Sequence, residues 1–283
     1  LLHAGCHGLY LDGGRLYPGF ALDELCAYVV GLNHYVTATG DETLVREPFV
    51  AHGLRHLESR LFARRHVGAW LFETTLSPGG AVPRRRCLTS ANALVALAFD
   101  ALQSLSDRGL HGVPQGAEAR AWRELAARVR EAVRANLVAD GPFGPMFAWS
   151  GDPDCGDAGE RELSDEPQGS LSLLAHWKLC PPDDPTLRNT LRWIHSDQNP
   201  RAALGGRVEG VSCRVGGEPS TLGIVNDLLA GRTEAARRAL LEAALDGGLA
   251  CEAFDRQTGR ASSGPAFASA AGWLAWAIAQ AFS

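Results

Sequence analysis

A helical signal lies in residues 21–30, which read Ala-Leu-Asp-Glu-Leu-Cys-Ala-Tyr-Val-Val. One face of this stretch repeats at i, i+3, i+4, i+7 and i+8, the spacing of an amphipathic helix, and it carries Leu22, Leu25, Cys26, Val29 and Val30. Gly40 is the predicted end of this helix, and Asp41 is a plausible N-cap for the next one. Pro48 is expected in or near the first turn of that second helix, where a missing N–H costs little.

The helical pattern continues outward from this stretch, and no segment alternates with period two for long, so we expect strands to be marginal. Helices are predicted at 21–40, 41–62, 92–99, 118–138, 168–178, 185–196, 220–230, 233–245 and 265–281. Residues 1–20 and 63–88 read as irregular, and 140–167 as one long loop. About nine helices in antiparallel pairs predict an all-α protein, a helical toroid forming a single domain over residues 1–283. A plain helical bundle remains an alternative.

Composition excludes several classes of function. The chain has 283 residues and a net charge of −5 without long charged runs, which argues against nucleic-acid and membrane-surface partners. Seven cysteines at irregular spacings contain no C-x-x-C pair, and no histidines form an H-E-x-x-H pattern, so neither a metal site nor a cofactor is expected. Scattered thiols and the lack of a signal-peptide pattern favour a cytoplasmic location.

Three segments combine acids with glycines, aromatics or helix starts. Asp23 and Glu24 either complement a helix dipole or contact substrate. Asp165 and Glu166 precede Pro167 and permit the same two interpretations. The third segment, 246–255, carries Glu252 among small and apolar residues, which suits acid–base chemistry, although a surface turn with incidental acids is the alternative.

Cys251, next to Glu252, suggests a nucleophile only weakly, because the sequence places no base or orienting group beside it.

A chain of short motifs resembles glycoside hydrolase family 125, the metal-independent exo-α-mannosidases, and the related (α/α)6-barrel or six-hairpin glycosidases. The best match runs from Asp165 to Gly210, and it includes Asp165-Glu166-Pro167, Ser170-Leu171-Ser172-Leu173-Leu174, Asp183-Asp184-Pro185, Arg188-Asn189-Thr190 and Ser196-Asp197-Gln198-Asn199-Pro200. Further along the chain, Cys251-Glu252-Ala253-Phe254-Asp255 resembles the family's "HESF" stretch, and Gly264-Pro265-Ala266-Phe267-Ala268 resembles its closing helix.

The resemblance implies an (α/α)6-type toroid that hydrolyses an α-linked sugar with inversion. Glu252 matches the family's general base, and Phe254 lies in the same "HESF"-like stretch. The helix of Asn92 resembles the segment behind the family's "PSDD" loop, whereas the family's "GSPHT" is eroded to Val211-Ser212-Cys213-Arg214-Val215. Where the family carries its acidic "PSDD" loop, however, this chain has Pro78-Gly79-Gly80-Ala81 without a carboxylate. Glu73, a few residues upstream in the same loop region, is one candidate replacement, and Asp23, Glu24, Asp165 and Glu166 are the others. The chain is also shorter than family members, so N-terminal helices are expected to be missing.

These observations predict a metal-independent inverting exo-glycoside hydrolase-like enzyme that acts on a small-molecule or carbohydrate substrate. Its general-acid position is lost, and its substrate contacts are expected at Asp23, Glu24, Asn92, Asp165, Glu166, Arg214 and Phe254. Two alternatives remain: a toroid repurposed for rearrangement or cyclisation of a small metabolite, and a non-catalytic sugar-binding relative.

Overall fold

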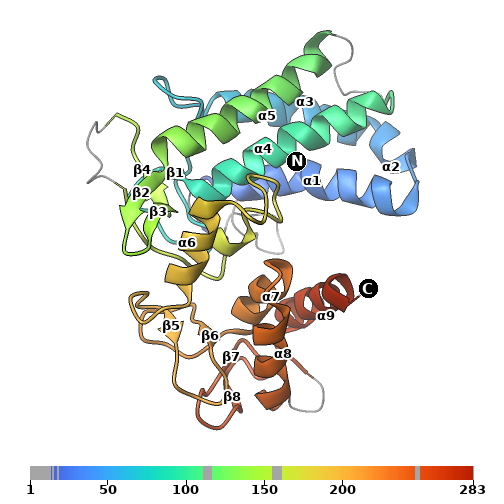
Figure 1. Ribbon diagram of the computed structural model, residues 1–283. Helices are drawn as coiled ribbons and strands as arrows, with labels where there is room; N and C mark the ends of the chain where they lie inside the picture. The colour runs from blue at the N-terminus through green and yellow to red at the C-terminus, as the bar shows by residue number, and fades with distance from the viewer. Residues whose placement is uncertain are drawn as a thin grey trace. The chain divides into compact units, whose positions relative to one another are not determined.

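The computed structural model describes residues 14, 16–17, 19–110, 117–154, 161–245 and 249–282 (Figure 1). The chain forms two compact units. Unit 1 comprises Leu1–Ala139, Ala148–Glu162 and Trp177–Leu179, and unit 2 comprises Asp140–Phe147, Leu163–His176 and Cys180–Ser283. A single domain over residues 1–283 therefore stays a prediction. The loop predicted for residues 1–20 lies almost wholly outside the described residues.

The helices of unit 1 follow the sequence pattern closely. They are α1 (Leu22–Thr39), α2 (Thr43–Arg46), α3 (Pro48–Phe62), α4 (Thr89–Asp107) and α5 (Ala117–Asn136). Gly40 ends α1 with a left-handed φ of 70°, as predicted. The predicted helix 41–62 is divided in two, because Glu47 adopts an extended conformation immediately before Pro48. Pro48 then occupies the first position of α3.

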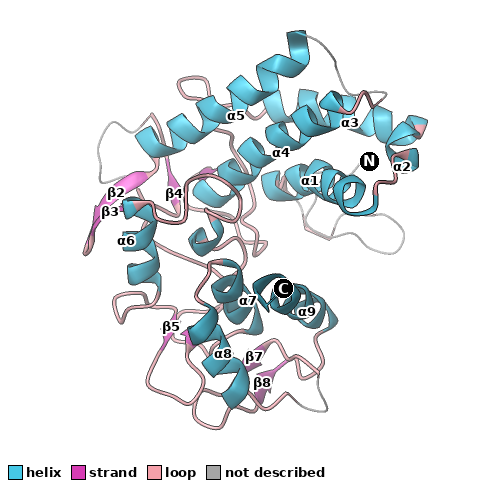
Figure 2. Cartoon of the chain, turned by 45° about the vertical axis from the view of Figure 1, so that its right-hand side comes forward, coloured by secondary structure: helices cyan, strands magenta, loops and turns pink. Residues whose placement is uncertain are grey.

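Helix α4 is the centre of unit 1, packed against α1 and α5 (Figure 2). Its small apolar residues are buried along almost the whole length of the helix. Three aromatic rings, those of Phe62, Phe72 and Phe99, meet with centroid distances between 6.1 and 6.4 Å. This aromatic cluster packs the end of α3 and the segment around residue 72 against α4.

The helices of unit 2 surround α7 (Thr221–Leu229), which packs against α8 (Thr233–Glu242) and α9 (Ala268–Phe282). Ile224, Val225 and Leu228 of α7 are buried in one hydrophobic cluster with Phe254 and Leu274. The remaining elements are α6 (Pro185–Ile194) and a 3₁₀ turn, η2 (Leu171–Leu173). The side chain of Asp184 accepts a hydrogen bond from the Leu187 amide and so caps α6.

The helix predicted at 168–178 is wrong, because only η2 forms there. Gly169 and Lys178 both have left-handed φ angles, 77° and 59°, which a continuous α-helix cannot contain. The Ser170 side chain also accepts the Ser172 amide, which replaces a helical hydrogen bond.

The strands are confirmed as marginal, because each sheet in the described residues consists of a single pair of very short strands. β1 (Cys87–Leu88) pairs with β4 (Ser150–Gly151), β2 (Val138–Gly141) with β3 (Gly144–Phe147), β5 (Ala202–Ala203) with β6 (Gly210–Val211), and β7 (Ala253–Phe254) with β8 (Ala261–Ser263). The predicted long loop 140–167 thus contains β3 and β4. The all-α class is confirmed.

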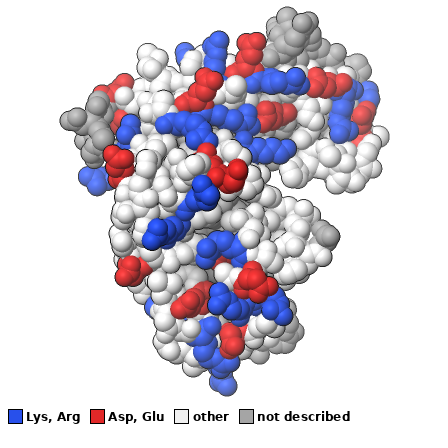
Figure 3. Space-filling model, in the orientation of Figure 1, with Lys and Arg blue, Asp and Glu red and all other residues white. Residues whose placement is uncertain are grey.

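The surface carries both signs of charge. On the face drawn in Figure 3, arginines are interspersed with Asp and Glu without a large patch of one sign. Among the described residues, no helix is both long and apolar enough to cross a bilayer. None of the five described cysteines forms a disulfide, and the cytoplasmic location stays a prediction.

The aromatic cluster of unit 1 predicts a large stability difference between two phenylalanines. We expect Phe99→Ala to lower the free energy of unfolding by about 3–5 kcal/mol, because Phe99 is fully buried and its removal leaves a cavity. Phe49→Ala on α3 is the control, because Phe49 is 58% exposed and its loss should cost no more than about 0.5 kcal/mol. Urea denaturation of both variants measures the difference, and equal losses would contradict the packing described for α4.

Candidate functional site

Glu252 sits immediately before β7 in unit 2, and its backbone is held from two sides. Its amide donates to the carbonyls of Ser263 and Gly264, at 3.2 and 3.0 Å. Its carbonyl accepts the amide of Thr221, at 3.0 Å, in the first turn of α7. The position of this residue is therefore set by α7 and by the β7–β8 hairpin together.

The carboxylate of Glu252 is half-buried, and its Oε2 accepts a hydrogen bond from the Ser263 hydroxyl at 3.1 Å. A carboxylate that is partly accessible and held in one orientation can exchange a proton with a bound water or substrate. The neighbouring Cys251 thiol donates to the Ala253 carbonyl, and burial raises its pKa. A raised pKa disfavours the thiolate, so the weak nucleophile interpretation of Cys251 gains no support.

Asp165 is fully buried and organises its own loop. Its Oδ1 accepts the Leu171 amide at 2.7 Å, and its Oδ2 accepts the Ser170 hydroxyl at 2.9 Å. Burial raises the pKa of this carboxyl to about 7, even though both hydrogen bonds lower it. Of the two interpretations of Asp165, the geometry favours the structural one, and a substrate contact stays a prediction.

Glu166, the next residue, forms an ion pair with Arg201 at 2.8 Å between Oε1 and Nη2. Both side chains are largely buried, at 19% and 15% exposed. Arg201 also donates to the carbonyl of Cys213. The pair therefore connects the acidic loop to the segment that carries Arg214.

Helix α7 connects this acidic loop to Glu252. The Asn226 side chain donates to the carbonyl of Pro167 at 2.8 Å, one and a half turns after Thr221. The Thr221 hydroxyl donates to the Cys251 carbonyl at 2.5 Å. The loop that begins at Asp165 and the segment around Glu252 are thus attached to the same helix.

The remaining predicted residues of unit 2 differ in accessibility. Arg214 is exposed, and its backbone amide donates to the Ser212 hydroxyl; a substrate contact of its guanidinium stays a prediction. Phe254 is fully buried in the hydrophobic cluster with α7 and α9. Its burial supports a packing role, and a substrate contact stays a prediction. Of the predicted segment 246–255, residues 246–248 lie outside the described residues.

Asp23 and Glu24 occupy the first turn of α1 in unit 1, as the sequence indicates. Burial, with a smaller contribution from the nearby Glu24 charge, raises the pKa of Asp23 to about 6. An Asp of this kind carries its proton at slightly acidic pH, which is the requirement for a proton donor.

Glu73 lies in an extended segment of unit 1 whose neighbours are buried. Its amide donates to the Arg64 carbonyl at 2.8 Å, and its carboxylate lies 3.6 Å from Arg86 Nη1. Asn92 holds this segment in place. Its side chain accepts the Phe72 amide at 2.7 Å and donates to the carbonyls of Phe72 and Leu88, so its full burial is satisfied by backbone partners. A direct substrate contact of Asn92 stays a prediction.

His66, Asp152 and Asp154 form a cluster of metal-ligating side chains in unit 1, with ligand atoms within 4.8 Å of one another. The Gly68 amide donates to His66 Nδ1 at 3.1 Å, so the neutral ring carries its proton on Nε2. That nitrogen lies 3.0 Å from Asp154 Oδ2 and serves as the donor to it. A metal-ligating histidine instead donates from its other nitrogen, so ordinary hydrogen bonds account for these contacts without a cation.

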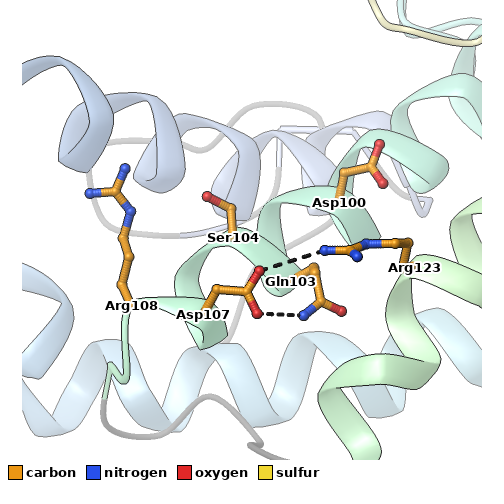
Figure 4. Close-up of a pocket in the computed structure, with 6 residues that line it drawn as sticks. All are labelled: Asp100, Gln103, Ser104, Asp107, Arg108 and Arg123. Carbon is orange, nitrogen blue, oxygen red and sulfur yellow. Dashed lines mark hydrogen bonds and ion pairs between the residues drawn. The ribbon is translucent and has the colours of Figure 1, made fainter.

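A surface pocket of about 510 Å³ lies on α4 and α5 (Figure 4), and it is lined by Asp100, Gln103, Ser104, Asp107, Arg108 and Arg123. Its charged groups are used internally, since Gln103 donates to Asp107 at 2.8 Å and Arg123 lies 3.7 Å from it. None of the predicted site residues lines this pocket. This pocket therefore contributes nothing to the predicted site.

The predicted site residues are divided between the two units: unit 2 contains Asp165, Glu166, Arg214, Glu252 and Phe254, and unit 1 contains Asp23, Glu24, Glu73 and Asn92. Sequence reasoning missed Arg201, Thr221 and Ser263, which hold the acidic groups of unit 2. Ser263 directly precedes the Gly264-Pro265 motif and Arg201 directly follows Pro200, so proximity to these motifs was the available signal.

Comparison with known proteins gives a clear result only at the level of structure. No family model matches the chain, and no curated protein matches it by sequence. A metal-independent alpha-mannosidase of Streptococcus pneumoniae, solved in a non-productive complex with alpha-1,6-mannobiose, superimposes with a TM-score of 0.78 at 16% identity. The match covers 99% of this chain and 74% of the mannosidase chain.

Two further glycosidases share the fold. A bacterial glucoamylase complexed with acarbose has a TM-score of 0.64 at 15% identity, over 96% of this chain and 42% of its own. The family GH78 rhamnosidase of Bacillus sp. GL1 has a TM-score of 0.59 at 12% identity, over 92% of this chain and 26% of its own. The chain thus spans less than half of these two relatives. The predicted likeness to (α/α)6 toroid glycosidases is confirmed for the fold.

The buried Asp165 carboxyl predicts a pH-dependent stability. The pKa of this carboxyl is about 7 in the folded chain, against an ordinary value of 3.8. Its contribution to the free energy of unfolding is therefore fully present below about pH 4 and is lost as the pH rises to 7. Asp165→Asn should remove this loss. We expect the free energy of unfolding of Asp165→Asn, relative to that of wild type, to increase between pH 5 and 7 by at most about 1.4 kcal/mol per pH unit.

Urea denaturation at pH 5, 6, 7 and 8 measures this difference. Asp255→Asn is the control, because hydrogen bonds from Thr258 lower the pKa of Asp255 and place its titration below this range. The difference between this control and wild type should be constant. A constant difference for Asp165→Asn as well would show that Asp165 is ionised throughout the range.

Proposed function

We propose that this chain is a glycoside hydrolase that cleaves an α-linked glycoside with inversion, and that Glu252 is its general base. The observation that carries the proposal is the half-buried Glu252 carboxylate, oriented by Ser263 and fixed to α7 through its backbone, on a fold shared with three glycosidases. Glu252 also matches the general-base position of glycoside hydrolase family 125, which the sequence resembles. A shared fold alone does not assign a function, so the proposal depends on the geometry around Glu252.

Inversion assigns Glu252 a defined task. It takes a proton from the attacking water while the water oxygen bonds to the anomeric carbon. The bond from that carbon to the leaving oxygen breaks, and the leaving oxygen takes a proton from a general acid on the opposite face. Two carboxyl groups accomplish both proton transfers, so the proposed reaction requires neither a metal nor a cofactor.

The general acid is the weak part of this site. Residues 77–81 form a tight turn, in which the Ser77 amide donates to the Ala81 carbonyl at 2.7 Å, and Gly79 and Gly80 offer no carboxylate. We propose Glu73 as the replacement; its carboxylate lies 3.6 Å from Arg86 Nη1. Asp23, with a pKa of about 6, is the second candidate.

Substrate contacts are proposed at the residues that the sequence singles out. Glu24 and Arg214 are exposed enough to meet a ligand directly. Asp165, Glu166, Asn92 and Phe254 act mainly through the backbone segments and packing that they support. The proposed substrate is a small α-linked glycoside or carbohydrate.

A weak general acid predicts a strong dependence on the leaving group. Losing general acid catalysis costs about 10²–10⁴-fold in rate, but an aryl leaving group needs no proton. We expect measurable release of nitrophenol from 4-nitrophenyl α-glycosides and little cleavage of methyl α-glycosides. Glu252→Gln should reduce aryl turnover by about 100-fold or more.

Three matched variants sharpen this experiment. Glu234→Gln should leave turnover unchanged, because Glu234 is exposed on α8. Glu73→Gln and Asp23→Asn should each be compared on both substrates, and the true acid is the one whose loss slows the alkyl but not the aryl glycoside. No turnover of either substrate class would contradict hydrolysis. Sugar binding that survives Glu252→Gln would then favour a non-catalytic relative.

A further inference from the structure

We infer that Ser263 and Gly264 are positioning residues for the Glu252 carboxylate. Ser263 donates a hydrogen bond to it, and Gly264, which has no side chain, leaves space beside it. The inference rests on the proposed function, in which Glu252 is the general base. Neither residue is assigned a role by the resemblance or by the comparisons. The contacts within the β7–β8 hairpin carry the argument.

The hairpin register brings Ser263 beside Glu252. Ser263, at the end of β8, pairs with Ala253, the residue after Glu252. The turn that sets this register is closed by Asp255, which accepts the amide and the hydroxyl of Thr258 at 2.7 and 2.8 Å. The Ser263 hydroxyl then donates to Glu252 Oε2 at 3.1 Å. No other hydrogen bond to this carboxylate is found among the described residues.

A hydrogen bond to a carboxylate stabilises its charged form. A general base must be ionised before it can accept a proton from water, so the Ser263 hydroxyl favours the working state of Glu252. It also selects one orientation of a side chain that is only half-buried. Removing it should therefore slow the chemical step more than it weakens substrate binding.

Gly264 leaves the room that the Glu252 side chain occupies. A Cβ at position 264 would lie 2.9 Å from Glu252 Cβ and 3.5 Å from Oε2. Contacts under 3.0 Å force an atom to move, and here the nearest atom is the stiff base of the side chain. The residue also has a φ of +48°, which is unfavourable for any side chain. Steric contact and backbone conformation both exclude larger residues at this position.

The first experiment tests Ser263 through kcat and KM on a 4-nitrophenyl α-glycoside. Ser263→Ala should lower kcat several-fold with KM nearly unchanged. Ser263→Thr restores the hydroxyl and should restore the wild-type kcat. A kcat of Ser263→Ala equal to that of wild type would overturn the role of Ser263.

The second experiment separates the contact at Gly264 from backbone strain. Gly231→Ala is the control, because Gly231 has a φ of +76° but nothing within 4 Å of an added Cβ. Both variants should lose stability from the left-handed backbone, and Gly264→Ala should lose at least as much as Gly231→Ala because of its added contact with Glu252. Only Gly264→Ala should lower kcat, by about 10-fold or more. An equal effect of both variants on kcat, or none, would overturn the role of Gly264.

A third measurement distinguishes failure of this inference from failure of the proposed function. The Glu252 side chain is compared in crystal structures of wild type and Ser263→Ala. A Glu252 carboxylate that is displaced in Ser263→Ala supports the inference even if no glycoside is hydrolysed. Hydrolysis that depends on Glu252, with an unchanged carboxylate position and an unchanged kcat in Ser263→Ala, overturns the inference and leaves the proposed function intact.

Discussion

The first turn of α7 is the constraint on which the candidate site of unit 2 depends. The amide and hydroxyl of Thr221 bind the carbonyls of Glu252 and Cys251, and Asn226 of the same helix binds Pro167. α7 can hold these segments because its apolar face is buried between α8 and α9. The burial energy of one short helix therefore fixes two loops that are far apart in the sequence.

Environment, rather than residue type, separates the acids of this chain into different roles. Asp165 is fully enclosed and uses both oxygens to close its loop, so its carboxyl is a structural group with a pKa near 7. Glu166 is neutralised by Arg201 across two loops. Within the part of the chain that the structure describes, Glu252 has one side-chain donor, and the residue stays half-buried. Of the three, Glu252 has the accessibility that proton transfer requires, which is why the proposed function depends on it.

Local patterns predicted most of the helices, because helix formation depends on spacing, caps and breakers that lie within one segment. α1 ends at Gly40 and α3 begins at Pro48 as expected, since these residues act through their own backbone. The failed prediction at 168–178 has the opposite cause. Its apolar residues suit a helix, but Gly169 is left-handed and Asp165 captures the Leu171 amide from outside the segment.

The sequence by itself determined the all-α class, the positions of most helices and the choice of Glu252 as the principal acid–base candidate. Only the tertiary structure decided which neighbours that carboxylate has. Ser263 reaches it through the register of a hairpin, and Arg201 reaches Glu166 across 35 residues of chain. Periodicity and motifs describe neighbours along the chain, whereas the orientation of a carboxylate depends on groups that only folding brings within hydrogen-bond distance.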